Sequence, residues 1–179
     1  MRVVATDIPD VRIVEPRVFG DDRGFFFESW NARTLAEQGI DATFVQDNHS
    51  RSRRGVLRGL HYQIEHAQGK LVRVVEGEVF DVAVDLRRSS PTFGRHVALL
   101  LSASNKLMLW VPPGFAHGFV VVSESADFLY KTTDYWYPEH ERTLQWNDPA
   151  LRIRWPIEDP QLAVKDQQGK PLAQADLYP

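Results

Sequence analysis

Apolar and polar residues alternate along short stretches of the chain, with the two-residue period of extended strands. In one such stretch, Phe80, Val82 and Val84 share one face of the expected strand. Asp81 and Asp85 share the other face. Residues that favour turns separate the stretches at short intervals, which predicts a protein built mainly of strands.

The expected strands are short and rich in β-branched and aromatic side chains. They cover residues 11–15, 25–30, 43–48, 56–63, 71–75, 79–85, 96–101, 107–111, 118–122 and 128–133. Many short strands separated by turns favour a β-sandwich, a barrel or a jelly roll.

Residues 31–39 are the one clear helix candidate, because Asn31 is a good N-cap and Leu35 supplies an apolar contact. Gly39 suits the position just beyond the end of that helix. From Pro138 onward the chain is rich in proline and tryptophan, which indicates a tail wrapped over the domain. We therefore expect residues 1–179 to form a single domain.

The composition is that of an ordinary globular protein, with 43% hydrophobic and 25% charged residues. A net charge of −3 gives no basic field that would attract nucleic acid. The absence of cysteine excludes disulfides, thiolate catalysis and cysteine-ligated zinc. No apolar run is long enough for a signal core or a membrane span, so we expect a cytoplasmic protein with no membrane partner.

Two histidines lie in similar settings about fifty residues apart. His61 ends the run Gly55-Val-Leu-Arg-Gly-Leu-His61, and His117 ends Pro112-Pro-Gly-Phe-Ala-His117. Lys70 lies between them, and Tyr130 follows in an apolar strand. Two histidines, a lysine and a tyrosine are sufficient to move a proton onto and off carbon. Either histidine alone is equally well explained as a hydrogen-bonded core residue.

The second histidine run resembles the second motif of cupins, which implies a jelly-roll barrel with its site inside. Metal-binding cupins usually carry His-x-His in their first motif, whereas this chain has His61-Tyr62-Gln63. His66 lies five residues after His61, out of step with the period of a strand. A site with three or four metal ligands is therefore hard to build, and we expect no metal.

A wider set of runs resembles the dTDP-4-dehydrorhamnose 3,5-epimerase family. The resemblance extends from near Arg12 to Asp166 without a missing block. The matching runs are residues 44–50, 55–63, 67–73, 79–85, 90–94, 113–119, 130–132, 146–149 and 165–166. The family relation implies a cupin-type jelly-roll β-barrel with a few short peripheral helices, no cofactor and a homodimer.

The resemblance also implies a role for each residue of the proton-transfer set. His61 matches the base that removes a proton next to a ketone, since the pKa of imidazole suits that task. Asp166 matches the carboxylate that orients this base. Lys70 and His117 are placed to stabilise the enolate, and Tyr130 matches the acid that returns the proton. Without the resemblance, Lys70 fits a surface strand, Tyr130 a core position and Asp166 a charged tail equally well.

Further positions match the family's contacts with the nucleotide sugar. Arg23 and Arg58 suit a diphosphate, which favours the guanidinium fork. Phe26 and Trp136 are candidates to stack on thymine, although the family often has tyrosine at the position of Trp136. Lys70 and His117 count among the substrate contacts, together with Glu28, Gln46, Asp47, Asn48, Glu141 and Lys165. Arg51, Arg53 and Arg54 are expected in a solvated turn.

The implied reaction inverts C3 and C5 of dTDP-4-dehydro-6-deoxy-D-glucose, giving dTDP-4-dehydro-L-rhamnose. Three alternatives stay open at this point. One is an epimerase acting at C3 alone or a keto-isomerase on a related dTDP-deoxysugar. The others are a non-catalytic jelly roll that binds nucleotide sugars and a metal-dependent cupin oxygenase. In the implied homodimer, Arg23 and its strand reach the neighbouring site.

Overall fold

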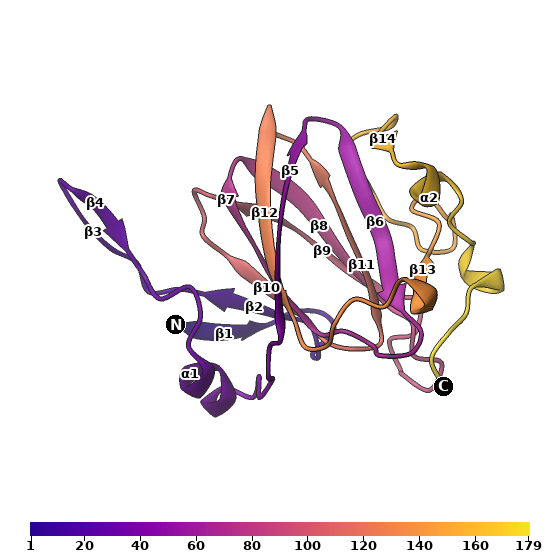
Figure 1. Cartoon of the computed structure of the whole chain (residues 1–179), viewed down its shortest axis with the longest axis horizontal. Helices are drawn as coiled ribbons and strands as arrows, with labels where there is room; N and C mark the ends of the chain where they lie inside the picture. Colours follow the sequence, from indigo (N-terminus) through magenta and orange to yellow (C-terminus); the bar gives the residue numbers. More distant parts are fainter.

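The computed structural model describes residues 1–179 as two antiparallel sheets that face each other, with a two-stranded hairpin to one side (Figure 1). The first sheet has the order β1-β2-β10-β7-β12-β5. Its strands are β1 (Arg2–Ala5), β2 (Arg12–Glu15), β10 (Met108–Val111), β7 (Lys70–Glu76), β12 (Ser125–Thr132) and β5 (Gln46–Arg53). This is the β-rich architecture that the alternating sequence predicts.

The second sheet has the order β13-β6-β11-β8-β9, with β14 paired in parallel to β6. Its strands are β13 (Glu141–Thr143), β6 (Val56–Gln63), β11 (Phe115–Val121), β8 (Glu78–Asp85), β9 (His96–Ser102) and β14 (Gln161–Leu162). Strands far apart in sequence pair within each sheet, so the two sheets form the jelly-roll barrel that was expected.

The main hydrophobic core fills the space between the sheets. Val72 and Phe128 of the first sheet meet Val79 and Phe119 of the second, and all four side chains are buried. The rings of Phe119 and Phe128 stack with their centroids 4.1 Å apart. Each such burial stabilises the fold by about 1.5–3 kcal/mol.

Strand β8 turns its polar face toward the interior of the barrel. The predicted alternation is present, but Phe80, Val82 and Val84 point outward into a second apolar cluster. Asp81 and Asp85 are completely buried. The apolar face therefore needs a cover on the outside of the second sheet.

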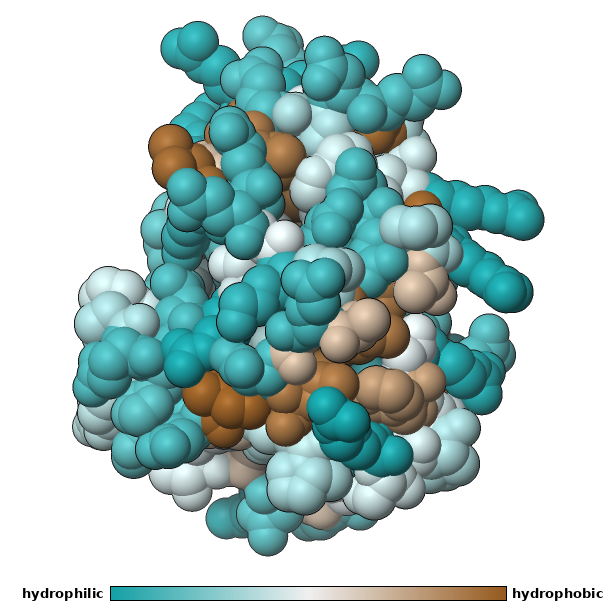
Figure 2. Space-filling model, turned by 90° about the vertical axis from the view of Figure 1, so that its right-hand side faces the viewer, coloured by the Kyte–Doolittle hydropathy of each residue, from teal (hydrophilic) through white to brown (hydrophobic).

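The strap, residues 145–179, supplies that cover. It includes α2 (Val164–Gln167) and the 3-10 turn Leu172–Gln174, and a further 3-10 turn, Pro138–His140, lies just before β13. Leu151 of the strap is buried against β8 and β6, and Trp155 packs edge-on against Phe80. Seen from the strap's side, the surface is mostly hydrophilic, with hydrophobic residues gathered in one band (Figure 2).

Helix α1 (Ala32–Glu37) forms where the sequence predicts it. The Asn31 side chain accepts a hydrogen bond from the Thr34 N–H (3.1 Å), as an N-cap should. Gly39 follows with φ = +85°, the left-handed conformation that ends many helices. Leu35 packs against the outside of the first sheet. None of the helices has the length and apolar character required to cross a bilayer.

The expected strand over residues 25–30 is wrong. Only β4 (Gly24–Phe26) is extended, and it pairs with β3 (Phe19–Asp21) in a hairpin that projects away from the barrel (Figure 1). Phe25 and Phe26 are 64% and 68% exposed. The aromatic run suggested a core strand, but no sheet lies against it in one copy of the chain.

The expected strand over residues 43–48 is displaced. Strand β5 starts at Gln46 and continues to Arg53, so Arg51 and Arg53 lie on a strand and only Arg54 is in a turn. Ser50 faces the cavity from this strand, whereas Arg51 is exposed on the other face and bonds Glu76. Both faces are polar, so hydrophobicity shows no period there. Strands β1, β13 and β14 also escape the pattern.

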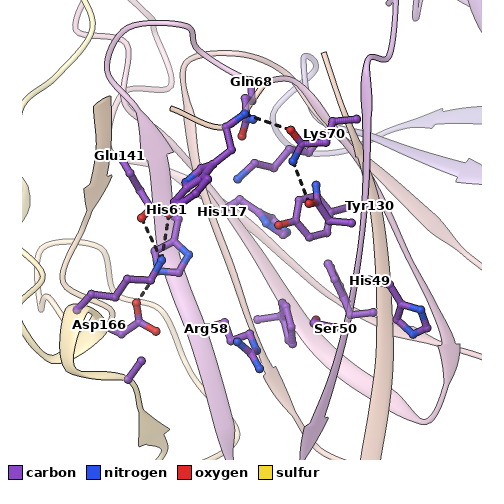
Figure 3. A pocket seen from close by; sticks show the side chains of 17 residues that line it. His49, Ser50, Arg58, His61, Gln68, Lys70, His117, Tyr130, Glu141 and Asp166 are labelled. Atoms are coloured by element: carbon purple, nitrogen blue, oxygen red, sulfur yellow. Dashed lines mark hydrogen bonds and ion pairs between the residues drawn. The ribbon is translucent and has the colours of Figure 1, made fainter. Parts of the chain in front are cut away.

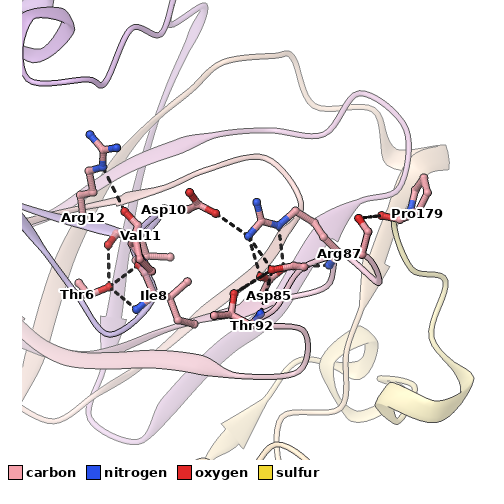
Figure 4. A network of polar contacts seen from close by, with 12 residues as sticks. Thr6, Ile8, Asp10, Val11, Arg12, Asp85, Arg87, Thr92 and Pro179 are labelled. Carbon is pink, nitrogen blue, oxygen red and sulfur yellow. Dashed lines mark hydrogen bonds and ion pairs between the residues drawn. The ribbon is translucent and has the colours of Figure 1, made fainter.

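A buried polar network fixes the turn between β8 and β9 (Figure 4). The Asp85 carboxylate accepts hydrogen bonds from Arg87 Nε (2.9 Å), Ser90 Oγ (2.6 Å) and Thr92 Oγ1 (2.6 Å). Burial alone would raise the pKa of Asp85, but these bonds lower it to about 2. Arg87 also bonds Asp10, which ties the N-terminal loop to this turn.

Candidate active site

A cavity of about 390 Å³ opens between the two sheets and beside the strap. It contains most of the residues that the sequence singles out (Figure 3). The expected proton-transfer residues that line it are His61, Lys70, His117, Tyr130 and Asp166, and the expected binding residues are Gln46, Asn48, Arg58, Trp136, Glu141 and Lys165.

His61 projects into the cavity from β6 and is paired with Asp166 of α2. Its Nε2 lies 2.5 Å from Asp166 Oδ1, although the two residues are 105 positions apart. The Asp166 side chain is 2% exposed and that of His61 is 20% exposed. Burial lowers the pKa of His61, and the Asp166 carboxylate only partly offsets this. The imidazole is therefore neutral at neutral pH and able to accept a proton.

A β-bulge in β6 turns both His61 and Arg58 toward the cavity. His117 of β11 is the register partner of His61, and Phe119 is the partner of Arg58, so β6 has one extra residue between these pairs. In a regular strand, side chains three apart point to opposite faces. The bulge removes this conflict, as bulges near active sites do.

Two glycines allow the bulge to form. Gly59 has φ = +137°, and a Cβ there would lie 2.6 Å from the Gly118 Cα. A Cβ on Gly118 would lie 2.7 Å from the Arg58 carbonyl oxygen. The two strands can approach this closely only because both residues lack a side chain.

His117 lies on the same wall as His61 and has its own carboxylate. Its Nε2 lies 3.0 Å from both oxygens of Asp81 on β8. Both side chains are buried. The sequence analysis did not assign Asp81 to the site, although its place on the polar face of β8 was a usable signal. Asp81 fixes the ring of His117 and leaves it as a rigid donor.

Lys70 enters the cavity at the start of β7. Its side chain is 9% exposed, and burial lowers its pKa to about 8. Glu141 and Asp81 oppose that shift by stabilising the charged form. The amine is thus mainly protonated at neutral pH, and it supplies a positive charge in a largely dry site.

Tyr130 faces the cavity from β12, on the wall opposite His61 (Figure 3). Burial raises the pKa of its hydroxyl, and the nearby charge of Glu141 raises it further. The phenol therefore keeps its proton at neutral pH. An acid on one wall thus faces a base on the other.

The rest of the lining favours an anionic ligand. Arg58, Lys70 and Lys165 are cations, while Glu141 and Asp166 are the carboxylates. Lys165 is paired with Glu141 at 3.0 Å. The carboxylate of Asp166 is directed at His61, so positive charge remains for a ligand.

Four expected binding residues lie away from this cavity. Arg23 and Phe26 are on the projecting hairpin, where the Arg23 guanidinium bonds Asp21. The Glu28 carboxylate bonds Asn31. Asp47 points to the other face of β5 and bonds Lys131 at 2.9 Å. One copy of the chain does not bring these four residues to the site.

Some cavity residues were missed because they are small or polar members of strands and loops. The added ones with polar side chains are His49, Ser50 and Gln68. Phe119 and Phe128 form part of the apolar floor. For His49 and Ser50, the signal was the alternation along β5, which places every second residue on one face.

The side chains contain no group of three His, Asp or Glu residues placed to share a metal ion. The histidines of the cavity each pair with one carboxylate, His61 with Asp166 and His117 with Asp81. These pairs are suited to controlling protons on imidazole.

Fold and cavity together define the class of protein: a cupin-like jelly-roll barrel with proton donors and acceptors inside it. Comparison with known proteins gives the family. The family model for dTDP-4-dehydrorhamnose 3,5-epimerase matches residues 5–174. The chain belongs to the dTDP-4-dehydrorhamnose 3,5-epimerase family.

Close relatives cover the whole chain. The dTDP-4-dehydrorhamnose 3,5-epimerase of Pseudomonas aeruginosa is 66% identical over 181 residues, which is 100% of each chain. The crystal structure of dTDP-6-deoxy-D-glucose-3,5-epimerase from Legionella pneumophila, in complex with dTDP-4-keto-L-rhamnose, superposes with a TM-score of 0.96. It is 52% identical and the match covers 99% of this chain and 97% of that one.

A relative with a narrower described activity is also similar. The 3'-monoepimerase of Streptomyces bikiniensis, solved in complex with dTDP-quinovose, superposes with a TM-score of 0.90 at 31% identity. The match covers 96% of this chain and 88% of that one. The same barrel thus occurs with a different outcome at the sugar.

Proposed function

We propose that this protein inverts C3 and C5 of dTDP-4-dehydro-6-deoxy-D-glucose and releases dTDP-4-dehydro-L-rhamnose. The observation that carries the proposal is the placement of a buried histidine–carboxylate pair and a protonated tyrosine on facing walls of one cavity. Inversion at carbon needs a proton to leave one face and another to arrive on the opposite face. A base and an acid on opposite walls meet that need.

The first step breaks a C–H bond next to the C4 ketone. His61 takes the proton, and the electron pair moves through the carbon framework onto the C4 oxygen to give an enolate. An ionised Asp166 accepts from the Nε2–H of His61, which leaves the Nδ1 lone pair to receive the proton. The lowered pKa of His61 keeps this lone pair available at neutral pH.

The enolate oxygen then needs a positive partner. The ammonium of Lys70 supplies one, because it stays mainly protonated at neutral pH despite its burial. His117 supplies a second donor whose position is fixed by Asp81. Fixed donors in a water-poor site stabilise developing negative charge more strongly than water does.

The second step returns a proton to the other face of the carbon. Tyr130 donates its hydroxyl proton, and the electron pair of the enolate forms the new C–H bond. This leaves a tyrosinate and a protonated His61. A proton passed from His61 to Tyr130 through water restores both groups for the next carbon.

The nucleotide is held by the cationic and polar side of the cavity. Arg58, anchored by its Nε bond to Ser52 Oγ (3.0 Å), presents its remaining guanidinium donors to the diphosphate. Lys165 adds positive charge near by. Trp136 offers an exposed ring to thymine. Gln46, Asn48 and Glu141 add polar contacts.

We also propose a homodimer in which the β3–β4 hairpin reaches the neighbouring copy. In one copy of the chain the hairpin leaves Phe19, Phe25 and Phe26 more than half exposed, which is unusual for large aromatic side chains. Arg23 at its tip pairs only with Asp21. A second copy would cover these rings and would bring Arg23 and Phe26 toward a nucleotide. Such an enzyme works in the cytoplasm, where nucleotide sugars are made.

A second candidate function is epimerisation at C3 alone, as described for the Streptomyces bikiniensis relative. The same base and acid serve either outcome. The choice depends on whether the ring can turn after the first inversion and present C5 to His61.

The test is to incubate the protein with dTDP-4-dehydro-6-deoxy-D-glucose in deuterated water and to locate the label by NMR. Label at both C3 and C5 is the expected result, and it should be unchanged by added chelator. Label at C3 alone supports the second candidate. No label with ligand still bound contradicts catalysis. His61→Ala should abolish label at both carbons, and near-normal labelling would contradict its role as the base.

A further inference from the structure

The Trp136 loop, residues 133–137, joins β12 to the 3-10 turn at Pro138. It contains no helix or strand. Its central residue, Trp136, lines the mouth of the cavity with 56% of its surface exposed. An irregular loop that presents a large exposed ring is costly to order when a ligand binds, unless the fold has already fixed it.

Gln63 holds this loop from inside. It lies at the end of β6, two residues after His61, and is 3% exposed. Its Nε2 donates to the carbonyls of His66 (2.7 Å) and Tyr135 (3.2 Å). Its Oε1 accepts from the N–H of Tyr137 (2.8 Å). One buried carboxamide therefore bonds the backbone on both sides of Trp136.

Other side chains hold the positions that Gln63 does not reach. The Trp136 N–H donates to Gln46 Oε1 (3.2 Å). The Asp134 carbonyl accepts from Gln68 Nε2 (2.9 Å) and from Thr132 Oγ1 (2.8 Å). Side chains from separate parts of the chain therefore bond the backbone of four consecutive residues, as a strand ladder would elsewhere.

The outer side of the loop is also fixed. Asp134 Oδ1 accepts from the N–H of Tyr135 (2.7 Å), and Asp134 Oδ2 lies 3.1 Å from His66 Nδ1. The His66 ring stacks on Tyr137 with centroids 4.1 Å apart. The loop is thus bonded on both sides before any ligand arrives.

We propose that Gln63 is a positioning residue for nucleotide recognition, acting through the backbone of the Trp136 loop to preset the indole against the base of dTDP. The inference rests on the proposed function, because it takes the ligand to be a dTDP-sugar. Gln63 does not line the cavity, so its effect on binding must pass through Trp136. A preset ring binds more tightly because less freedom is lost on binding.

The first test is Gln63→Met, which keeps the volume and removes all three bonds. The control is Gln174→Met, the same change at an exposed position whose side chain makes no hydrogen bond. With dTDP as the probe in calorimetry, Gln63→Met should weaken binding about tenfold. The control should leave it unchanged. KM should rise with kcat within about twofold, because the His61 pair is untouched. A fall in kcat with unchanged KM would overturn the proposal.

The decisive test repeats Gln63→Met in a Trp136→Ala background. If Gln63 acts through the indole, the second change should weaken dTDP binding by less than about twofold once the ring is gone. The same tenfold loss in both backgrounds would overturn the proposal, since it would mean that Gln63 acts on the fold as a whole.

Asp134→Ala provides a surface variant if Gln63→Met does not fold. It should weaken dTDP binding in the same direction, and Asp134→Asn should restore it, because the amide oxygen still accepts from the Tyr135 N–H. Equal affinity in Asp134→Ala and the unaltered protein would count against a preset loop. An unaltered protein that binds dTDP but incorporates no deuterium would contradict the proposed function alone.

Discussion

Two histidine–carboxylate pairs share one wall of the cavity, but their surroundings give them different tasks. His61 keeps 20% of its side chain exposed beside Asp166, whereas His117 is 7% exposed beside Asp81. A base must reach its substrate and exchange protons with water. A donor to an enolate only has to stay still. The difference in access therefore assigns removal of the proton to His61.

Changing Tyr130 to Phe should separate the two halves of the reaction. The variant lacks only the hydroxyl, so the ring still packs near Phe128 and the base is intact. Loss of substrate deuterium to water should continue, while formation of inverted product should fall by about 10²–10⁴-fold, the usual contribution of a general acid. NMR of both processes in one sample checks this. Equal loss in the two would argue against Tyr130 as the acid.

The pH profile of kcat/KM should reflect His61 on the acid side and Lys70 on the alkaline side. Burial lowers the pKa of His61 from the ordinary 6.5, so activity should fall only below that value, as the base becomes protonated. Lys70 loses its charge near pH 8, so activity should fall as pH rises through about 8. An alkaline limb above 10 would instead assign it to Tyr130, whose pKa is raised.

At the scale of the element, the bulge in β6 and its contact with β11 decide where the site points. Arg58 and His61 serve opposite ends of the proposed ligand, yet both depend on one extra residue in the strand. The alternative without a bulge would send one of them to the strap side. Positioning here is a property of paired strands.

Gly118→Ala should therefore impair the site more than it impairs the fold. The new methyl group meets the Arg58 backbone at 2.7 Å, and overpacking of this kind costs about 1–3 kcal/mol of stability. Activity should fall by more than tenfold in protein that is still folded, because Arg58 and His61 are displaced. Gly20→Ala, which meets only ordinary contacts, is the control for stability. Unaltered kcat and KM in Gly118→Ala would refute this view of the bulge.

The sequence predicts elements well where burial alternates and poorly where it does not. Strand β6 has the expected bounds, and β8 differs by one residue, because their apolar positions pack on one side. The strand expected at 25–30 failed because its aromatic residues are exposed in one copy of the chain. Strand β5 was misplaced because both of its faces are polar.

For the site, local patterns reach only part of the way. The two histidines follow from glycine-flanked strands, and their placement as register partners agrees with the expected neighbouring segments. The pairing of His61 with Asp166 spans 105 positions, so no periodicity could indicate it, and only the family resemblance did. The partnership of His117 with Asp81 was missed, because an alternating pattern does not say which face is inside.

At the scale of the whole molecule, we propose that residues 1–179 unfold as one unit. The strap buries Leu151 and Ala175 against the apolar outer face of the second sheet, so neither part has a complete core alone. Thermal unfolding followed by tryptophan fluorescence and by backbone circular dichroism should give one coincident transition. Two separated transitions would show an independently stable strap or barrel.

The proposed exchange of hairpins makes a sharp prediction for mixed dimers. If Arg23 serves the neighbouring site, Arg23→Ala and His61→Ala subunits should each be inactive or severely impaired alone. Co-expressed, they should recover about a quarter of normal activity, because roughly half of the dimers are mixed and each has one intact site. A hairpin that serves its own subunit would give no recovery, since neither subunit would hold both residues.

The strap also sets the time at which chemistry becomes possible. Every strand of the first sheet, and both histidines, precede Asp166 in the chain. During synthesis, the barrel wall that carries His61 is thus complete while the carboxylate that orients this base has still to leave the ribosome. A nascent chain can therefore hold the cavity without the completed base. Activity begins only when α2 docks, so its appearance is a direct clock for the last event of folding.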